Sequence, residues 1–167
     1  YRVDVFVRDI QSGAAGMRKV GFVAPEFPAD RLSASSVVLA AKLQNLQARA
    51  AIDPFVIGTT KVVPNLSGTY RRGQPVGVYL QIYNTATDQT TVRPATDVEY
   101  VLLRNGKELS KQTEDWRQIN DAGQRLTLTR LIDTRNLEPG EYQIQVRIRD
   151  QVSGETIAPA AIFTIAP

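Results

Sequence analysis

The chain contains no cysteine and no histidine among its 167 residues. The lack of cysteine excludes disulfides and thiolate nucleophiles, and the lack of both residues excludes zinc sites built from these ligands. Without histidine, neither a serine–histidine triad nor a histidine acid–base pair can form. Asp and Glu carboxylates are the main remaining candidates for acid–base chemistry. The sequence therefore predicts a protein that is not an enzyme and that uses no cofactor.

Long apolar runs and strong charge of one sign are also missing. No run approaches the about 20 apolar residues that span a bilayer, so we expect no transmembrane segment. The 20 Lys and Arg residues exceed the 17 Asp and Glu residues by only three and are scattered along the chain. Nucleic-acid binding needs a concentrated basic face. We therefore expect no nucleic-acid partner.

Alternation of apolar and polar residues is the dominant pattern. Residues 76–83 place Val76, Val78, Leu80 and Ile82 on one side, which is typical of a half-buried strand. Asn105-Gly106 is a strong hairpin signal between two further strands. Seven or more such strands, with turns every 8–15 residues, predict an all-β, antiparallel sandwich resembling immunoglobulin or fibronectin type III domains. The 42–51 segment, rich in helix formers with Leu43, Leu46 and Ala50 at helical spacing, favours a short helix, with a mobile loop as the alternative.

The two ends of the chain are similar to each other. Residues 1–13 and 142–154 share six of 13 positions, namely Tyr, Val, Arg, Asp, Ser and Gly. With a one-residue gap, both segments also close on a similar tripeptide ending in Ala-Pro. We interpret residues 1–25 as the last two strands of a preceding sandwich module, 26–31 as a linker, and 32–167 as a complete module. The chain starts directly in a strand, so we treat it as a fragment of a longer protein.

The C-terminal copy of the repeat follows a recognisable turn. Leu137, a Pro-Gly turn at Gly140 and then Tyr142 resemble the corner where a Tyr hydroxyl of immunoglobulin-like sandwiches bonds the backbone. Asp150 and Gly154 supply turn chemistry after this strand. Asp9 occupies the position equivalent to Asp150, which favours a structural role for both. We predict structural roles for Leu137, Gly140, Tyr142, Asp150 and Gly154.

Several segments resemble one bacterial family. They are Pro54–Gly58, Lys61–Pro64, Tyr79–Asn84, Asp88 with Thr91 and Pro94, Leu137–Tyr142 and Ala161–Ile165. Together they resemble the C-terminal region of bacterial proteins that carry a GWxTD domain and are predicted to be exported. The GWxTD signature itself is absent from this chain. The resemblance implies a secreted, periplasmic or cell-envelope location and supplies no catalytic residues.

Two sets of side chains are candidates for binding. Glu114, Asp115 and Asp121 form the densest acidic cluster, a weak calcium candidate beside the single Trp, Trp116. The alternative interpretation of this cluster is a solvated loop. Trp116 either covers one end of the core or contacts a ligand or partner. The other set is an outward strip of Tyr79, Gln81 and Tyr83, which stacks on sugar rings, binds a partner surface or forms ordinary cross-strand pairs.

The N-terminal hairpin raises a physical problem. An isolated two-stranded hairpin is marginal in water, and its apolar residues Tyr1, Val3, Val5 and Val7 need a covering surface. We expect a protein partner, or self-association through this hairpin, with Phe6 covering a neighbouring surface. The predicted function is a structural spacer and protein-interaction module. The alternatives are a carbohydrate-binding module that takes polysaccharide, and a hydrolase that would need a cleft holding two carboxylates.

Overall fold

The computed structural model describes residues 1–46, 55–57, 60–114, 120–121 and 125–167. These residues form strands, turns and loops, and no helix occurs among them, so none of the described segments could cross a membrane as a helix. The strands are β1 (Arg2–Arg8), β2 (Ala15–Gly21), β3 (Ser33–Ala34), β4 (Val38–Asn45), β5 (Val56–Ile57), β6 (Thr60–Pro64), β7 (Thr69–Tyr70), β8 (Val76–Tyr83), β9 (Thr87–Asp88), β10 (Arg93–Pro94), β11 (Thr96–Arg104), β12 (Lys107–Glu114), β13 (Asn120–Asp121), β14 (Arg125–Ile132), β15 (Gly140–Asp150), β16 (Thr156–Ile157) and β17 (Ala160–Ile165).

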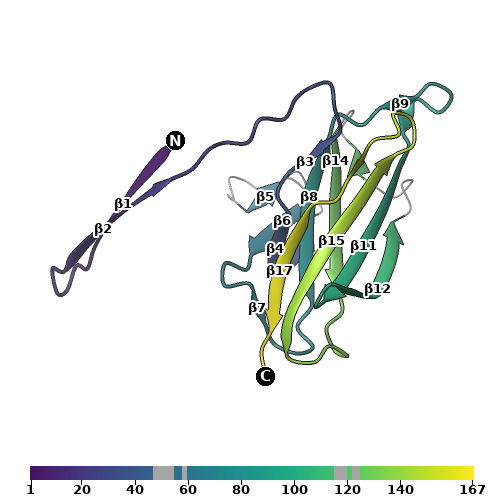
Figure 1. The fold of residues 1–167 in the computed structure, drawn as a ribbon. Coiled ribbons are helices and arrows are strands. Elements are labelled where there is room, and N and C mark those ends of the chain that lie inside the picture. Colours follow the sequence, from purple (N-terminus) through teal and green to yellow (C-terminus); the bar gives the residue numbers. More distant parts are fainter. Residues whose placement is uncertain (47–54, 58–59, 115–119, 122–124) are drawn as a thin grey trace.

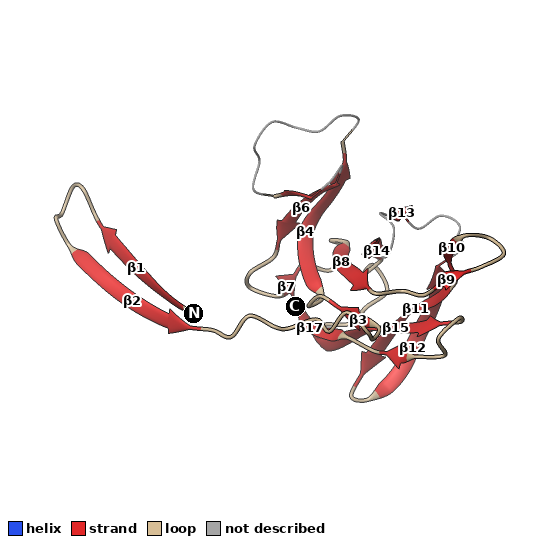
Figure 2. Cartoon of the chain, turned by 90° about the horizontal axis from the view of Figure 1, so that it is seen from above, coloured by secondary structure: helices blue, strands red, loops and turns tan. Residues whose placement is uncertain are grey.

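Two sheets pack face to face and confirm the predicted β-sandwich (Figures 1 and 2). One sheet has the order β12-β11-β15-β17-β7, with β16 added beside β15. The other has the order β13-β14-β8-β4-β6-β5, with β3 added beside β8. All pairings are antiparallel except that of β17 with β7, which is parallel. A separate pair, β9 with β10, forms a small ribbon at one end.

The core lies between the two sheets and follows the alternation in the sequence. On β8 the four predicted inward residues are fully buried, and on β15 every second residue from Tyr142 to Ile148 is buried. Burying one such side chain contributes roughly 1.5–3 kcal/mol relative to leaving it exposed. The core residues are Leu32, Tyr70, Val76, Val78, Leu80, Ile82, Val98, Tyr100, Leu102, Leu126, Leu128, Ile132, Tyr142, Ile144, Val146, Ile148, Phe163 and Ile165. Every one of them lies within residues 32–167.

The predicted hairpin turn forms between β11 and β12. Asn105 has a φ of 52° and Gly106 a φ of 75°. Positive φ at both central residues is the requirement of a two-residue turn whose twist matches the flanking strands, and Asn-Gly meets it at low cost. This sequence signal was therefore sufficient to position the β11–β12 pair.

The helix predicted from residue 42 is wrong over the described part of the segment. Residues 42–45 continue β4 and pair with β6, where Leu43 lies opposite Val62. The register shifts between Ala40 and Lys42, so β4 pairs with β8 up to Ala40 and then follows β6 alone. Pairing with β6 and packing of Leu43 on the sheet outweigh the local helix propensity. Residues 47–51 lie outside the described residues.

The N-terminal hairpin stands away from the sandwich. β1 pairs only with β2, in a register that places Val3 opposite Val20 and Val7 opposite Gly16. All residues from 1 to 31 are exposed, and Figures 1 and 2 show the hairpin at the end of an extended arm. The sandwich therefore buries none of the hairpin, and its core is complete without it.

Candidate interaction surfaces

The outward strip on β8 is only partly accessible. Tyr79 is 3% exposed, because Ala40 of β4 and Val62 of β6, the next two strands of the same sheet, pack against it. The expectation that Tyr79 is exposed is therefore wrong. Gln81 and Tyr83 are half-buried. The three side chains instead form a hydrogen-bonded row, in which Gln81 Nε2 donates to Tyr79 Oη and Tyr83 Oη donates to Gln81 Oε1, each at 2.9 Å.

The linker binds the end of this strip. The ring of Phe27 lies 4.8 Å from the ring of Tyr83, centroid to centroid. Asn84 Nδ2 donates to the carbonyl of Pro28 at 2.8 Å and to that of Arg31 at 3.2 Å. These contacts fix where the arm leaves the sandwich and cover part of Tyr83. Neither Phe27 nor Asn84 was singled out from the sequence. An aromatic residue beside a Pro in an otherwise polar linker was the available signal.

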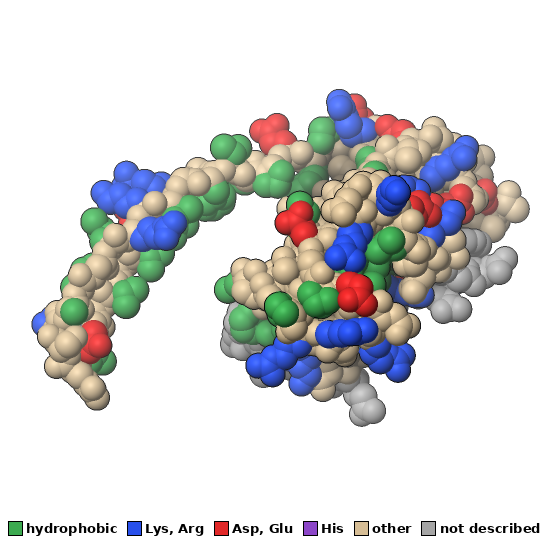
Figure 3. Space-filling view, turned by 60° about the horizontal axis from the view of Figure 1, so that its bottom comes forward, with side chains coloured by type: hydrophobic (Ala, Val, Ile, Leu, Met, Phe, Trp, Pro, Cys, Tyr) green, Lys and Arg blue, Asp and Glu red, His purple; other side chains and the backbone are tan. Residues whose placement is uncertain are grey.

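One side of the N-terminal hairpin is a row of apolar side chains, which we call the hairpin face. Its six residues are 45–84% exposed. Figure 3 shows apolar side chains along the concave side of the arm, with Lys and Arg on its outer side. A shallow groove crosses the face where Gly16, lacking a side chain, lies opposite Val7. The hairpin face consists of Tyr1, Val3, Val5, Val7, Val20 and Phe22.

Phe6 lies on the other side of the hairpin. It pairs with Met17 across the two strands, and the two side chains are 67% and 63% exposed. Phe6 therefore covers no neighbouring surface within the described residues. Around this pair the side is polar, with an Arg2–Asp4 ion pair at 3.1 Å. The two sides of the hairpin thus differ in chemistry: the hairpin face is apolar except for Arg18, which lies opposite Val5, whereas the other side carries charged residues around the Phe6–Met17 pair.

The acidic cluster is described only in part. Trp116 and Asp115 lie outside the described residues, and the Asp121 side chain is likewise not described. Glu114 is half-buried at the end of β12, where its Oε2 accepts a bond from Arg130 Nη1 at 3.4 Å. No group of three or more acidic residues within the described ranges is placed to hold a metal ion. Glu114 thus forms an ion pair with Arg130 in this structure.

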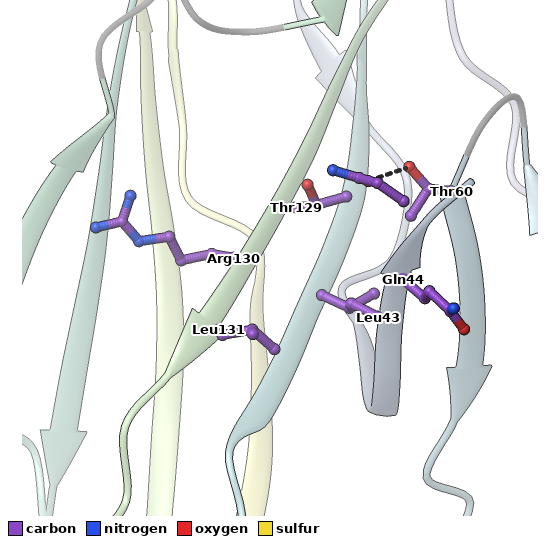
Figure 4. Close-up of a pocket in the computed structure, with 7 residues that line it drawn as sticks. Leu43, Gln44, Thr60, Thr129, Arg130 and Leu131 are labelled. Carbon is purple, nitrogen blue, oxygen red and sulfur yellow. Dashed lines mark hydrogen bonds between the residues drawn. The ribbon is translucent and has the colours of Figure 1, made fainter. Parts of the chain in front are cut away.

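The pocket in Figure 4 lies where β4 diverges from β8. It has a volume of about 220 Å³, below the roughly 300–1,000 Å³ of typical small-molecule sites. Leu43, Thr129 and Leu131 line it, and Thr60 Oγ1 donates to Asn45 Oδ1 at 3.4 Å. Arg130, the charged residue among the described lining residues, points away from the others toward β12, where it bonds Gln112 and Glu114. The pocket is lined mainly by hydroxyl, amide and apolar groups.

The predicted structural residues occupy the two turns around β15. Tyr142 Oη donates to the carbonyl of Glu138 at 2.7 Å, which is the bond expected from the Pro-Gly-x-Tyr pattern. Leu137 packs against the core. Gly140 has a φ of 140°, a conformation reserved for glycine, and a side chain there would meet Arg104 Nη2 at 3.0 Å. Arg104 caps the corner by donating to the Pro139 carbonyl, an interaction that sequence patterns could not reveal.

Asp150 is fully buried and holds the turn after β15. Its Oδ1 accepts the backbone N–H groups of Val152 at 2.9 Å and Ser153 at 3.2 Å. Its Oδ2 accepts the N–H of Ala86, in the loop after β8, at 2.6 Å. Gly154 closes the same turn with a φ of 76°. One carboxylate therefore connects the two sheets at this end of the sandwich.

No protein-family model and no curated protein matches the chain. The candidate surfaces are therefore interpreted from their own residues.

Proposed function

We propose that the chain is a non-catalytic, immunoglobulin-like module that acts as a spacer and contacts another protein through the hairpin face. The observation that carries this proposal is the row of six exposed apolar side chains on an otherwise unsupported hairpin. Exposed apolar rows of this kind mark sites of protein contact. Such a two-stranded ribbon needs a covering surface to be stable in water.

Two further features support the immunoglobulin-like part of the proposal. The central strands follow the order β4-β8-β14 in one sheet and β12-β11-β15-β17 in the other, as in sandwiches of this class. The tyrosine corner at Tyr142 occurs at the matching place before β15. The resemblance to the C-terminal region of GWxTD-domain proteins supports an exported bacterial protein and a secreted, periplasmic or envelope location.

The experiment compares residues 1–167 with residues 26–167 by light scattering over a wide concentration range. The shorter chain keeps the linker contacts of Phe27 and Asn84 and the whole core, so it is expected to fold by itself. We expect residues 1–167 to form a concentration-dependent dimer and residues 26–167 to remain monomeric. Val5→Asp should abolish the dimer, whereas Lys19→Gln, on the opposite side of the hairpin, should not.

A strictly monomeric mass for residues 1–167 would contradict self-association through the hairpin face. Dimerisation of residues 26–167 to the same extent would move the contact surface to the sandwich itself.

A further inference from the structure

The N-terminal hairpin has the same turn as the pair β15–β16. In the hairpin, Asp9 Oδ1 accepts the N–H groups of Gln11 at 2.7 Å and Ser12 at 3.0 Å, and Gly13 N–H donates to the Asp9 carbonyl at 2.9 Å. At the other end of the chain, Asp150 accepts the N–H groups of Val152 and Ser153, and Gly154 N–H donates to its carbonyl at 2.9 Å. The sequence repeat is thus also a structural repeat.

The equivalence extends along both strands. Tyr1 stacks on Phe22 at 5.5 Å with 18° between the rings, and Tyr142 stacks on Phe163 at 5.6 Å with 19°. Both pairs are 21 residues apart, so the two copies align as far as Phe22 without the gap suggested by their closing residues. β1 therefore corresponds to β15, and β2 corresponds to β16 with the start of β17.

The same positions have opposite surroundings in the two copies. The apolar row of β15, Tyr142, Ile144, Val146 and Ile148, is at most 2% exposed, because the sheet containing β8 and β14 covers it. The equivalent row of β1, Tyr1, Val3, Val5 and Val7, is 46–84% exposed. The hairpin face therefore has the side-chain pattern of a core strand and lacks the sheet that such a strand packs against.

The side chains of the two equivalent Asp residues differ in the same way. Asp150 Oδ2 accepts the N–H of Ala86 from the opposite sheet, whereas Asp9 has bonds only within its own turn. In the complete module, the Ala86 partner of Asp150 comes from chain that precedes β15.

One edge of β1 also lacks a neighbour. β15 is paired on one side with β17 and on the other with β11, over eight residues. β1 is paired with β2 alone. Because Tyr1 and Asp9 direct their N–H groups to β2, the alternation of antiparallel pairing leaves the N–H groups of Asp4, Phe6 and Arg8 on the free edge. The equivalents of these three residues lie on β15 at positions that face β11.

We propose that β1 and β2 are the closing strand pair of a second sandwich, whose other strands lie N-terminal to Tyr1 in the same polypeptide. In that sandwich, a strand equivalent to β11 pairs with the free edge of β1. A facing sheet covers the hairpin face, and Asp9 Oδ2 accepts a backbone N–H from that sheet. The source is the preceding chain because β3, β4, β8, β11 and β14 all precede β15 in the complete module. This inference goes beyond the proposed contact with another protein, because the segment that covers the hairpin face belongs to the same polypeptide.

The test compares residues 1–167 with a longer chain that adds the natural preceding segment, at least as long as residues 32–139. Amide hydrogen exchange is followed at Asp4, Phe6 and Arg8. In the longer chain we expect exchange at these amides to slow by at least about 100-fold, because they would then open only with the sheet. In residues 1–167, studied at a concentration where the chain is monomeric, we expect rapid exchange at the same amides.

Paired variants separate a core strand from an incidental contact. Asp9→Ala and Val5→Asp should lower the unfolding temperature of the added sandwich in the longer chain, and neither should change the unfolding of residues 26–167 within the shorter one. Asp150→Ala is the matched change in the complete module and should destabilise it in both chains. Lys19→Gln is the control on the opposite side of the hairpin and should have no effect in either chain.

Equal exchange rates at Asp4, Phe6 and Arg8 in the two chains would overturn the inference. Protection of these amides in residues 1–167 that appears only on dimerisation, and that the longer chain does not increase, would also overturn it, since the second copy would then be the occupant. A monomeric residues 1–167 fragment would count against self-association alone and leave this inference standing.

Discussion

The hydroxyl of Tyr142 is bonded to the backbone carbonyl of Glu138 at 2.7 Å, across the turn that leads into β15. The same ring stacks on Phe163 of the neighbouring strand, and the guanidinium of Arg104 lies 5.3 Å from the ring centroid. One side chain therefore connects the turn, the core and the β11–β15–β17 sheet. This arrangement makes the corner a good place to measure what a single hydroxyl contributes.

Replacing Tyr142 with Phe should remove that bond and preserve the stacking. We expect the free energy of unfolding to fall by about 1 kcal/mol, the usual net contribution of one hydrogen bond. The midpoint of urea unfolding measures it. Tyr1→Phe is the matched control, because Tyr1 holds the equivalent position in an exposed strand, and it should leave the midpoint unchanged. Equal midpoints for Tyr142→Phe and the unmodified chain would show that the corner bond adds no stability.

Local patterns predicted much of this sandwich because their causes are local. The inward row of β8 follows from alternation over eight residues, and the turn between β11 and β12 follows from the conformational freedom of Asn105 and Gly106. The repeat predicted the equivalence of β1 and β15. The first two signals each lie within a short stretch of chain, whereas the repeat was found by comparing residues 1–13 with residues 142–154.

The burial of Tyr79 could not be predicted in the same way. It depends on the path of β4, which pairs with β8 as far as Ala40 and then continues with β6 alone. That path depends on a register shift and on pairing with residues fifteen or more positions away. The local sequence of this segment favours a helix. Long-range pairing decided both its secondary structure and the accessibility of Tyr79.

Gly77 lies in close contact with β4, at the point where β4 begins to diverge from β8. A Cβ at this position would lie 2.9 Å from Leu43 Cγ and 3.0 Å from the carbonyl oxygen of Ala40. We expect Gly77→Val to lower the free energy of unfolding by about 1–3 kcal/mol, because the backbone of β4 would have to move. Denaturant unfolding of residues 26–167 measures this change. Gly16→Ala in the full chain is the control, since no other atom lies within 4 Å of a Cβ there, and it should be neutral.

Tyr70 should make stability depend on alkaline pH. Burial raises the pKa of Tyr70 to about 12, partly offset by the Asn65 side chain, compared with about 10 in an unfolded chain. Because the folded-state pKa is higher, the folded state holds this proton more tightly. The stabilisation is complete below about pH 10 and is lost as the pH rises toward 12.

Urea unfolding between about pH 9 and pH 12 tests this dependence through the variant Tyr70→Phe. The variant should lose less stability than the unmodified chain across this range. Some loss should remain, because burial also raises the pKa of Tyr100. Parallel stability curves for the two proteins would contradict the assignment to Tyr70.

The side chain of Asn84 should limit the access of proteases to the linker. Its Nδ2 holds the carbonyls of Pro28 and Arg31, and its own φ is 60°. Asn84→Gly keeps that backbone conformation accessible and removes the amide. Losing about 1 kcal/mol of hydrogen-bond free energy between Asn84 and the linker should speed trypsin cleavage after Arg31 by about 5-fold, as followed by mass spectrometry.

Asn105→Gly, another left-handed Asn in a turn, is the control and should leave the cleavage rate unchanged, because Asn105 does not contact the linker. If Asn84→Gly is cut after Arg31 no faster than this control, the linker is held by its Phe27–Tyr83 contact and the Asn84 bonds contribute nothing measurable.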